Sequence, residues 1–198
     1  MFKNRLTFTL ISLCFSFLAY AQTPTLVINE VSNGASGTKE YFEFLVDGPK
    51  TNSCQAPATL DLRDWIIDDN NGFFGSGSNK GIATGAFRFK NIAFWSAVPV
   101  GTLIVIYNDA DYESSLIQND ISLTDGNCKL VIPCTSNLLE AQTTTPTPSS
   151  SNYPSSGWAT PTNWSAVGLR NDGDGVLILR PTNTGVPIHS LAYGDVNT

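Results

Sequence analysis

Residues 25–46 have the sequence TLVINEVSNGASGTKEYFEFLV, in which two runs rich in Val, Ile, Phe and Tyr, 25–31 and 40–46, flank a turn of small and polar residues. This pattern is typical of two strands joined in a hairpin. The rest of the chain continues in the same way, and no window has the period of a long amphipathic helix. Short strands without helices must bury their faces against one another, which predicts an all-β fold, an antiparallel β-sandwich of about eight strands with long loops. The further expected strands lie within 60–68, 86–90, 102–107, 129–132, 176–180 and 187–193.

Two of these strands give more detail. In 60–68 the apolar residues change from one face to the other between Leu62 and Trp65, which predicts a bend or bulge near Arg63 and Asp64. In 102–107 (TLIVIY) both faces are apolar. We therefore expect this strand in the interior of a sheet.

The composition narrows the classes of protein. The chain has 198 residues, of which only 14% are charged, with 16 Gly, 11 Pro and a formal net charge of −6. This turn-rich and weakly charged composition argues against a coiled coil or a helical bundle, and the negative charge argues against a nucleic-acid partner. Residues 143–165 are rich in Thr, Ser and Pro, which indicates a long loop inserted in the domain.

The N-terminus has the organisation of a cleavable export signal. Lys3 and Arg5 precede an uncharged apolar run, 6–18, and Ala19 and Ala21 match the small residues of a cleavage site. The sequence predicts a signal peptide over 1–21, a mature domain over 22–198, and a secreted or cell-surface protein with no transmembrane segment after cleavage.

Four cysteines are present, and Cys14 would leave with the signal peptide. An oxidising compartment favours a disulfide among the remaining three. Cys128 and Cys134 are the first candidate pair because they are close in sequence, and Cys54 with either of them is the alternative.

Acidic residues gather in the predicted turns and offer a candidate calcium site. Calcium binds several oxygen ligands supplied by flexible loops. The alternative is that Asp suits turns because it bonds its own main chain. The candidate ligands are Asp68, Asp69, Asp109, Asp111, Asp172 and Asp174.

Three aromatic residues interrupt the polar loop and are candidates for ligand binding. Tyr153, Trp158 and Trp164 could form a platform for a glycan, or they could hold the loop against the domain.

Catalytic residues are scarce in this sequence. His189 is the single histidine and has no nucleophile motif beside it, so a structural role is expected. Glu30 and Glu43 could face each other across the first hairpin as an acid and a base, or Lys39 or Arg63 could neutralise one of them. No catalytic residue is assigned.

Six segments in order resemble the lamin tail domain family, in the branch found in secreted bacterial proteins. They are 27–31 (VINEV), 40–44 (EYFEF), 62–65 (LRDW), 98–106 (VPVGTLIVI), 168–174 (GLRNDGD) and 190–195 (SLAYGD). The resemblance implies an immunoglobulin-like β-sandwich. His189 departs from it, standing where relatives commonly carry an acidic residue.

The resemblance also implies a setting. Members of this family are generally non-catalytic modules, so we expect a protein that is not an enzyme, needs no cofactor, and serves extracellular or cell-surface interaction or structural support. Its expected partner is an extracellular protein or a glycan. Two alternatives remain open: an accessory domain of a secreted nuclease or phosphatase encoded beyond residue 198, and a calcium-dependent glycan-binding domain.

Overall fold

The structure, a computed structural model, describes residues 22–35, 38–49, 58–69, 85–114, 118–142, 153, 155–169, 171, 173–182 and 186–194. The predicted signal peptide, Cys54 and most of the first half of the Thr/Ser/Pro-rich loop lie outside these residues. Within them, no helix is long and apolar enough to cross a membrane.

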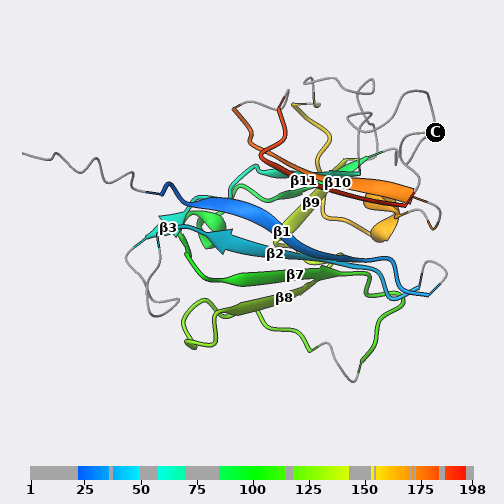
Figure 1. Cartoon of the computed structure of the whole chain (residues 1–198), viewed down its shortest axis with the longest axis horizontal. Coiled ribbons are helices and arrows are strands. Elements are labelled where there is room, and N and C mark those ends of the chain that lie inside the picture. Colours follow the sequence, from blue (N-terminus) through cyan, green and yellow to red (C-terminus); the bar gives the residue numbers. More distant parts are fainter. Residues whose placement is uncertain are drawn as a thin grey trace, which may run out of the picture.

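Two β-sheets pack face to face (Figure 1). The first sheet has the strand order β1-β2-β7-β8, with β1 (Thr25–Ser32), β2 (Tyr41–Asp47), β7 (Leu103–Tyr107) and β8 (Lys129–Pro133). The second sheet has the order β11-β10-β4-β5-β9, with β11 (His189–Gly194), β10 (Gly173–Leu179), β4 (Ile66–Asp69), β5 (Ala86–Phe89) and β9 (Leu139–Gln142). The remaining elements are a short pair, β3 (Thr59–Leu60) with β6 (Val98–Pro99), and two 3-10 helices, η1 (Ala93–Trp95) and η2 (Trp164–Val167).

The prediction of an all-β sandwich is confirmed. The described residues form more strands than predicted, and one neighbouring pair, β7 with β8, is parallel. Residues 108–128 connect these two strands, which is long enough for the crossover that a parallel pair needs. The sequence did not reveal β6 and β9, because β6 has only two residues and the four residues of β9, LEAQ, are too few for their alternation to distinguish a strand from a turn.

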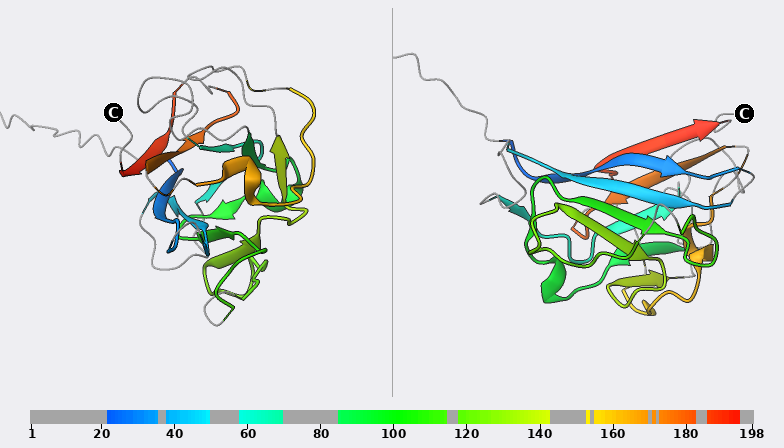
Figure 2. Two further views of the ribbon diagram at one scale, coloured as in Figure 1. Left: turned by 90° about the vertical axis from the view of Figure 1, so that its right-hand side faces the viewer. Right: turned by 90° about the horizontal axis from the view of Figure 1, so that it is seen from below.

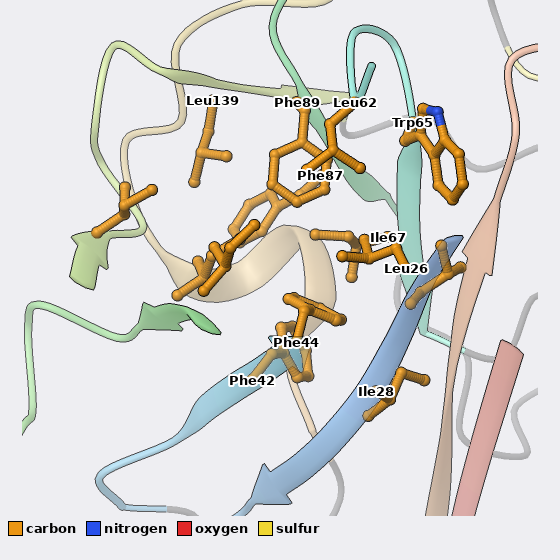
Figure 3. Close-up of a cluster of buried hydrophobic side chains, with 14 of the residues drawn as sticks. Leu26, Ile28, Phe42, Phe44, Leu62, Trp65, Ile67, Phe87, Phe89 and Leu139 are labelled. Carbon is orange, nitrogen blue, oxygen red and sulfur yellow. The ribbon is translucent and has the colours of Figure 1, made fainter. Parts of the chain in front are cut away.

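Apolar side chains from both sheets meet between the layers (Figure 3). Leu26, Ile28, Phe42 and Phe44 come from the first sheet, and they point toward side chains of β4 and β5 in the second. Alternate residues of β2 are buried and half-buried, as the period of two in a strand requires. The buried side chains of β2 belong to the core, and the half-buried side chains between them lie on the outer face of the sheet.

The predicted irregularity near Arg63 and Asp64 is present. Asp64 adopts a φ of 63°, a left-handed conformation that non-glycine residues rarely take. Its backbone N–H donates to the carbonyl of Phe89 (2.9 Å), and Arg63 uses the Asp61 carboxylate as its ion-pair partner (2.5 Å). The turn changes which face the side chains point to, so that Leu62 and Trp65 are both buried.

β7 lies between β2 and β8, in the interior of its sheet as predicted. Ile104 and Ile106 are fully buried on the core side. Leu103 and Val105, on the opposite side, are only half-buried. Packing in the core explains why Ile104 and Ile106 are apolar, but it does not explain why Leu103 and Val105 on the outer face are apolar as well.

The structure corrects the predicted pairing of Cys128 with Cys134. Cys134 is a free, buried thiol, and its Sγ donates to Asp109 Oδ1 (3.1 Å). Cys128 is disulfide-bonded, and its partner is not among the described residues. Cys128 and Cys134 sit at opposite ends of β8. An extended strand of that length separates them by about 20 Å, whereas a disulfide needs Cα atoms about 4.4 to 6.8 Å apart.

Candidate functional site

A groove of about 510 Å³ lies on the outer face of the first sheet. Its size falls within the range of about 300 to 1,000 Å³ that is usual for ligand clefts. Side chains of β2, β7 and β8 form it, with residues from the turn after β1 and the loop after β7 at its rim. Figure 2 shows these strands from below, side by side across one face of the molecule.

The floor of the groove is aliphatic. Leu103 and Val105 point outward from β7, and Val131 points outward from the neighbouring β8, where its Cα is the register partner of Val105. The backbone of β7 pairs on one side with β2 and on the other with β8. Because this ladder uses the backbone donors and acceptors, the floor offers a ligand apolar contact and no main-chain hydrogen bonds.

An ion pair closes one part of the rim. Lys39 Nζ lies 2.7 Å from Glu113 Oε2, joining the start of β2 to the loop after β7. The hydrogen bond that Lys39 donates to Glu113, together with the negative charge of Glu113, raises the pKa of Lys39. The two side chains are exposed, so their pairing stabilises the fold little. The pair nevertheless neutralises the charges of Lys39 and Glu113 at the rim of the groove.

Two other charged groups face the groove from opposite sides. Glu43 projects from β2, and Lys129 projects from the first position of β8. Neither forms an ion pair with any residue of the described ranges. Glu43 Oε1 accepts a hydrogen bond from Asn29 Nδ2 (2.5 Å). Asp120, near Lys129, has its pKa lowered by a hydrogen bond from Asn127 and to a lesser degree by the charge of Lys129.

Glu30 and Glu43 do face each other across the first hairpin, since their Cα atoms are register partners next to a bulge in β1. Each carboxylate has a different hydrogen-bond donor. Tyr41 Oη donates to Glu30 Oε1 (2.7 Å), and this hydrogen bond together with burial raises the pKa of Tyr41 to about 12. The two carboxylates thus hold Tyr41 and Asn29 in place. The predicted partners Lys39 and Arg63 are instead paired with Glu113 and Asp61.

His189 joins the two sheets. Its Nδ1 accepts a hydrogen bond from the backbone N–H of Ile28 (3.0 Å), where β1 begins its bulge. This contact satisfies a backbone donor at the edge of the first sheet, which is a structural role.

Chemically, the groove combines an aliphatic floor, one acidic and one basic group that form no ion pair within the described part of the chain, and a rim whose charges neutralise each other. It can bind an apolar group and hold charges of both signs beside it. Comparison of the chain with protein-family models, with curated proteins and with solved structures finds no match. A proposal for the function of this protein therefore depends on the geometry of the groove.

The calcium candidates are spread over both sheets. Asp68 and Asp174 are fully buried on neighbouring strands of the second sheet, whereas Asp109 and Asp111 follow β7 of the first sheet. Asp68 accepts a hydrogen bond from Tyr153 Oη, and Asp109 accepts from Cys134 and Thr135. In the described ranges, no three His, Cys, Asp or Glu side chains gather as metal ligands would. The side chain of Asp69 and the whole of Asp172 lie outside those ranges.

The three aromatic candidates are not brought together on one exposed surface. Trp164 is 5% exposed in the main core, where its ring lies 4.9 Å from that of Phe42. Tyr153 and Trp158 instead pack on an apolar cluster at the outer face of the second sheet. Trp158 lies beneath Arg88, whose guanidinium carbon is 4.4 Å from the ring centre.

The sequence analysis named Glu43 and Lys39 at the border of the groove, but it did not single out the residues of the floor. One signal pointed to them: Leu103 and Val105 are apolar on the face of 102–107 opposite the core residues. We interpreted that pattern as a strand covered on both faces. A groove lined by apolar side chains satisfies the same pattern.

Proposed function

We propose that the protein is an exported, non-catalytic interaction module, a β-sandwich that binds a partner through the groove on the outer face of β2, β7 and β8. The observation that carries the proposal is the aliphatic floor, in which Leu103 and Val105 are half-buried and Val131 is 4% exposed, bordered by charged groups. Ligand clefts are typically concave and mostly apolar, with a few polar or charged groups that fix the orientation of the ligand.

The setting of this module is also a proposal. Export follows from the predicted signal peptide at 1–21, and kinship with the lamin tail domain family, with an immunoglobulin-like arrangement, follows from the six segments that resemble it. An all-β sandwich is compatible with that kinship. An extracellular protein is the partner that an aliphatic floor with charged borders suits best, because protein surfaces present apolar and charged side chains side by side.

A peptide selection tests the proposed function. A library of random twelve-residue peptides is selected on the immobilised protein, with counter-selection on the Val105→Lys variant, which places an ammonium group in the floor. We expect enriched peptides that bind wild type and lose at least tenfold in affinity for Val105→Lys. Thermal unfolding of both proteins confirms that the variant is folded. If no peptide that binds wild type more tightly than folded Val105→Lys is enriched, the groove is not the site.

A further inference from the structure

The two borders of the groove carry opposite charges, and this deepens the proposed function on which the following inference rests. Glu43 stands on β2 and Lys129 on β8, with the aliphatic floor on β7 and β8 between them. An occupant that satisfies both groups must present a basic group to Glu43, an acidic group to Lys129, and an apolar group to the floor.

The register of the strands gives the separation of the two charges. Glu43 is paired with Val105, and Lys129 is paired with Leu103, so they stand in rows two residues apart along β7. They are also two strands apart, since β7 lies between β2 and β8. With about 4.8 Å between neighbouring strands and about 3.3 Å per residue, their Cα atoms are about 12 Å apart.

We propose that the groove receives an extended segment of a partner protein with the pattern acidic-x-apolar-x-basic, or the same pattern in reverse. Alternate side chains of an extended chain point to the same side, so residues 1, 3 and 5 of the segment face the groove together. Residues 1 and 5 are separated by about 13 Å, four residues at about 3.3 Å each. This matches the spacing of Lys129 and Glu43, with residue 3 above Leu103 and Val105.

Recognition at this site works through side chains. β2 and β7 are paired on both sides within the sheet, and the outer edge of β8 is bridged at Val131 by Asp120, so a segment lying across the groove meets side chains and is not an added strand. Its own backbone lies away from the floor, in contact with water. Both directions of the segment are therefore equivalent in charge, provided that the acidic residue reaches Lys129 and the basic residue reaches Glu43.

The ion pair at the rim sharpens this selectivity. Lys39 and Glu113 neutralise each other, so they supply no net charge that would compete for the ends of the segment. The charge preference of the groove accordingly depends on Glu43 and Lys129. Replacing either one by a group of opposite sign should change which peptide binds.

The test uses short fluorescein-labelled peptides with blocked termini, whose affinities are measured by fluorescence anisotropy. ETVTK and KTVTE carry the proposed pattern, while ETVTE, KTVTK and the shortened ETVK do not. Wild type should bind ETVTK and KTVTE up to about fivefold more tightly than the other three, since an exposed ion pair contributes up to about 1 kcal/mol, or about fivefold in affinity.

Charge reversal in the protein gives the sharper result. Lys129→Glu should prefer KTVTK over ETVTK by about tenfold, and Glu43→Lys should prefer ETVTE over ETVTK to a similar degree. Lys90→Glu serves as the matched control, because Lys90 follows β5 in the second sheet and should leave wild-type preferences unchanged.

Three outcomes would overturn the inference. Equal binding of all five peptides by wild type would remove the charge pattern, and unchanged preferences in Lys129→Glu would remove its assignment to this residue. Peptides selected through Val105 that lack the acidic-x-apolar-x-basic pattern would overturn the inference while leaving the proposed function intact. Because ETVTE and KTVTK alter only the peptide, the comparison holds even if a protein variant does not fold.

Discussion

Replacing Trp158 with alanine tests how the outer face of the second sheet is covered. Trp158 packs with Tyr153 on a cluster formed by Ile66, Ala86, Leu177 and Leu179, and its ring lies under the guanidinium of Arg88. The same guanidinium pairs with Glu140 (2.7 Å). The indole thus holds its segment against the sheet and covers apolar side chains.

The expected loss of stability combines two contributions. Complete burial of an indole removes up to about 250 Å² from water, worth about 6 kcal/mol at about 25 cal/mol per Å². Trp158 is half-buried, which reduces this to at most about 3 kcal/mol. The partly buried cation–π contact with Arg88 adds about 1 kcal/mol. Because the area estimate is an upper bound, we expect a total of about 3 kcal/mol, or a fall in Tm of about 6 to 12 °C.

The free energy of unfolding is measured in urea by far-UV circular dichroism, which does not depend on the fluorescence of the residue removed. Trp158→Phe, which keeps an aromatic ring, should lose about 1 kcal/mol. A change below 0.5 kcal/mol for Trp158→Ala, roughly the scale of a surface substitution, would refute the reasoning, because an aromatic ring held out for a ligand does not stabilise the fold.

Three further predictions concern buried or bonded groups. Burial, together with a hydrogen bond to Asp109, raises the pKa of the Cys134 thiol to about 12. Iodoacetamide at pH 8 should therefore modify Cys134 only after unfolding, which mass spectrometry would show. Rapid modification of the native protein would contradict the burial of this thiol. Burial raises the pKa of Glu40 above 4.5, so the folded state favours the protonated form of this carboxyl group. The free energy of unfolding of wild type should therefore increase relative to that of Glu40→Gln as the pH falls from 7 to 4.5. If the difference between the two proteins does not change with pH, the pKa of Glu40 is not raised. His189→Ala leaves the backbone N–H of Ile28 without its acceptor and should cost about 1 to 3 kcal/mol in urea denaturation, whereas an unchanged midpoint would show that the contact is dispensable.

Local patterns predicted much of the fold. The first hairpin, the turn at Asp64 and the interior position of β7 all follow from the order of apolar and polar residues within a few positions. The parallel pairing of β7 with β8 does not, because register across a long connection depends on contacts that are distant in sequence. The pairing of Cys128 with Cys134 was wrong for a related reason: closeness in sequence is not closeness in space when an extended strand lies between.

The site was harder to predict than the fold. Glu30 and Glu43 were recognised as an unusual pair within a hairpin, and the structure brings them together. The role of Lys129 could not be seen, because nothing in its neighbourhood along the chain indicates that Glu43 stands two strands away. A lysine at the start of a strand is ordinary in sequence. The strand order β2-β7-β8 is what brings Lys129 to the same groove as Glu43.

The central claim is that the outer face of β2, β7 and β8 is the binding surface, and methyl-detected NMR tests it most directly. Adding the ETVTK peptide to the protein with labelled Ile, Leu and Val methyl groups should shift the signals of Leu103, Val105 and Val131. The signals of Leu177 and Leu179, on the outer face of the second sheet, should stay in place. Shifts confined to the second sheet, or no shift at millimolar peptide, would contradict the account.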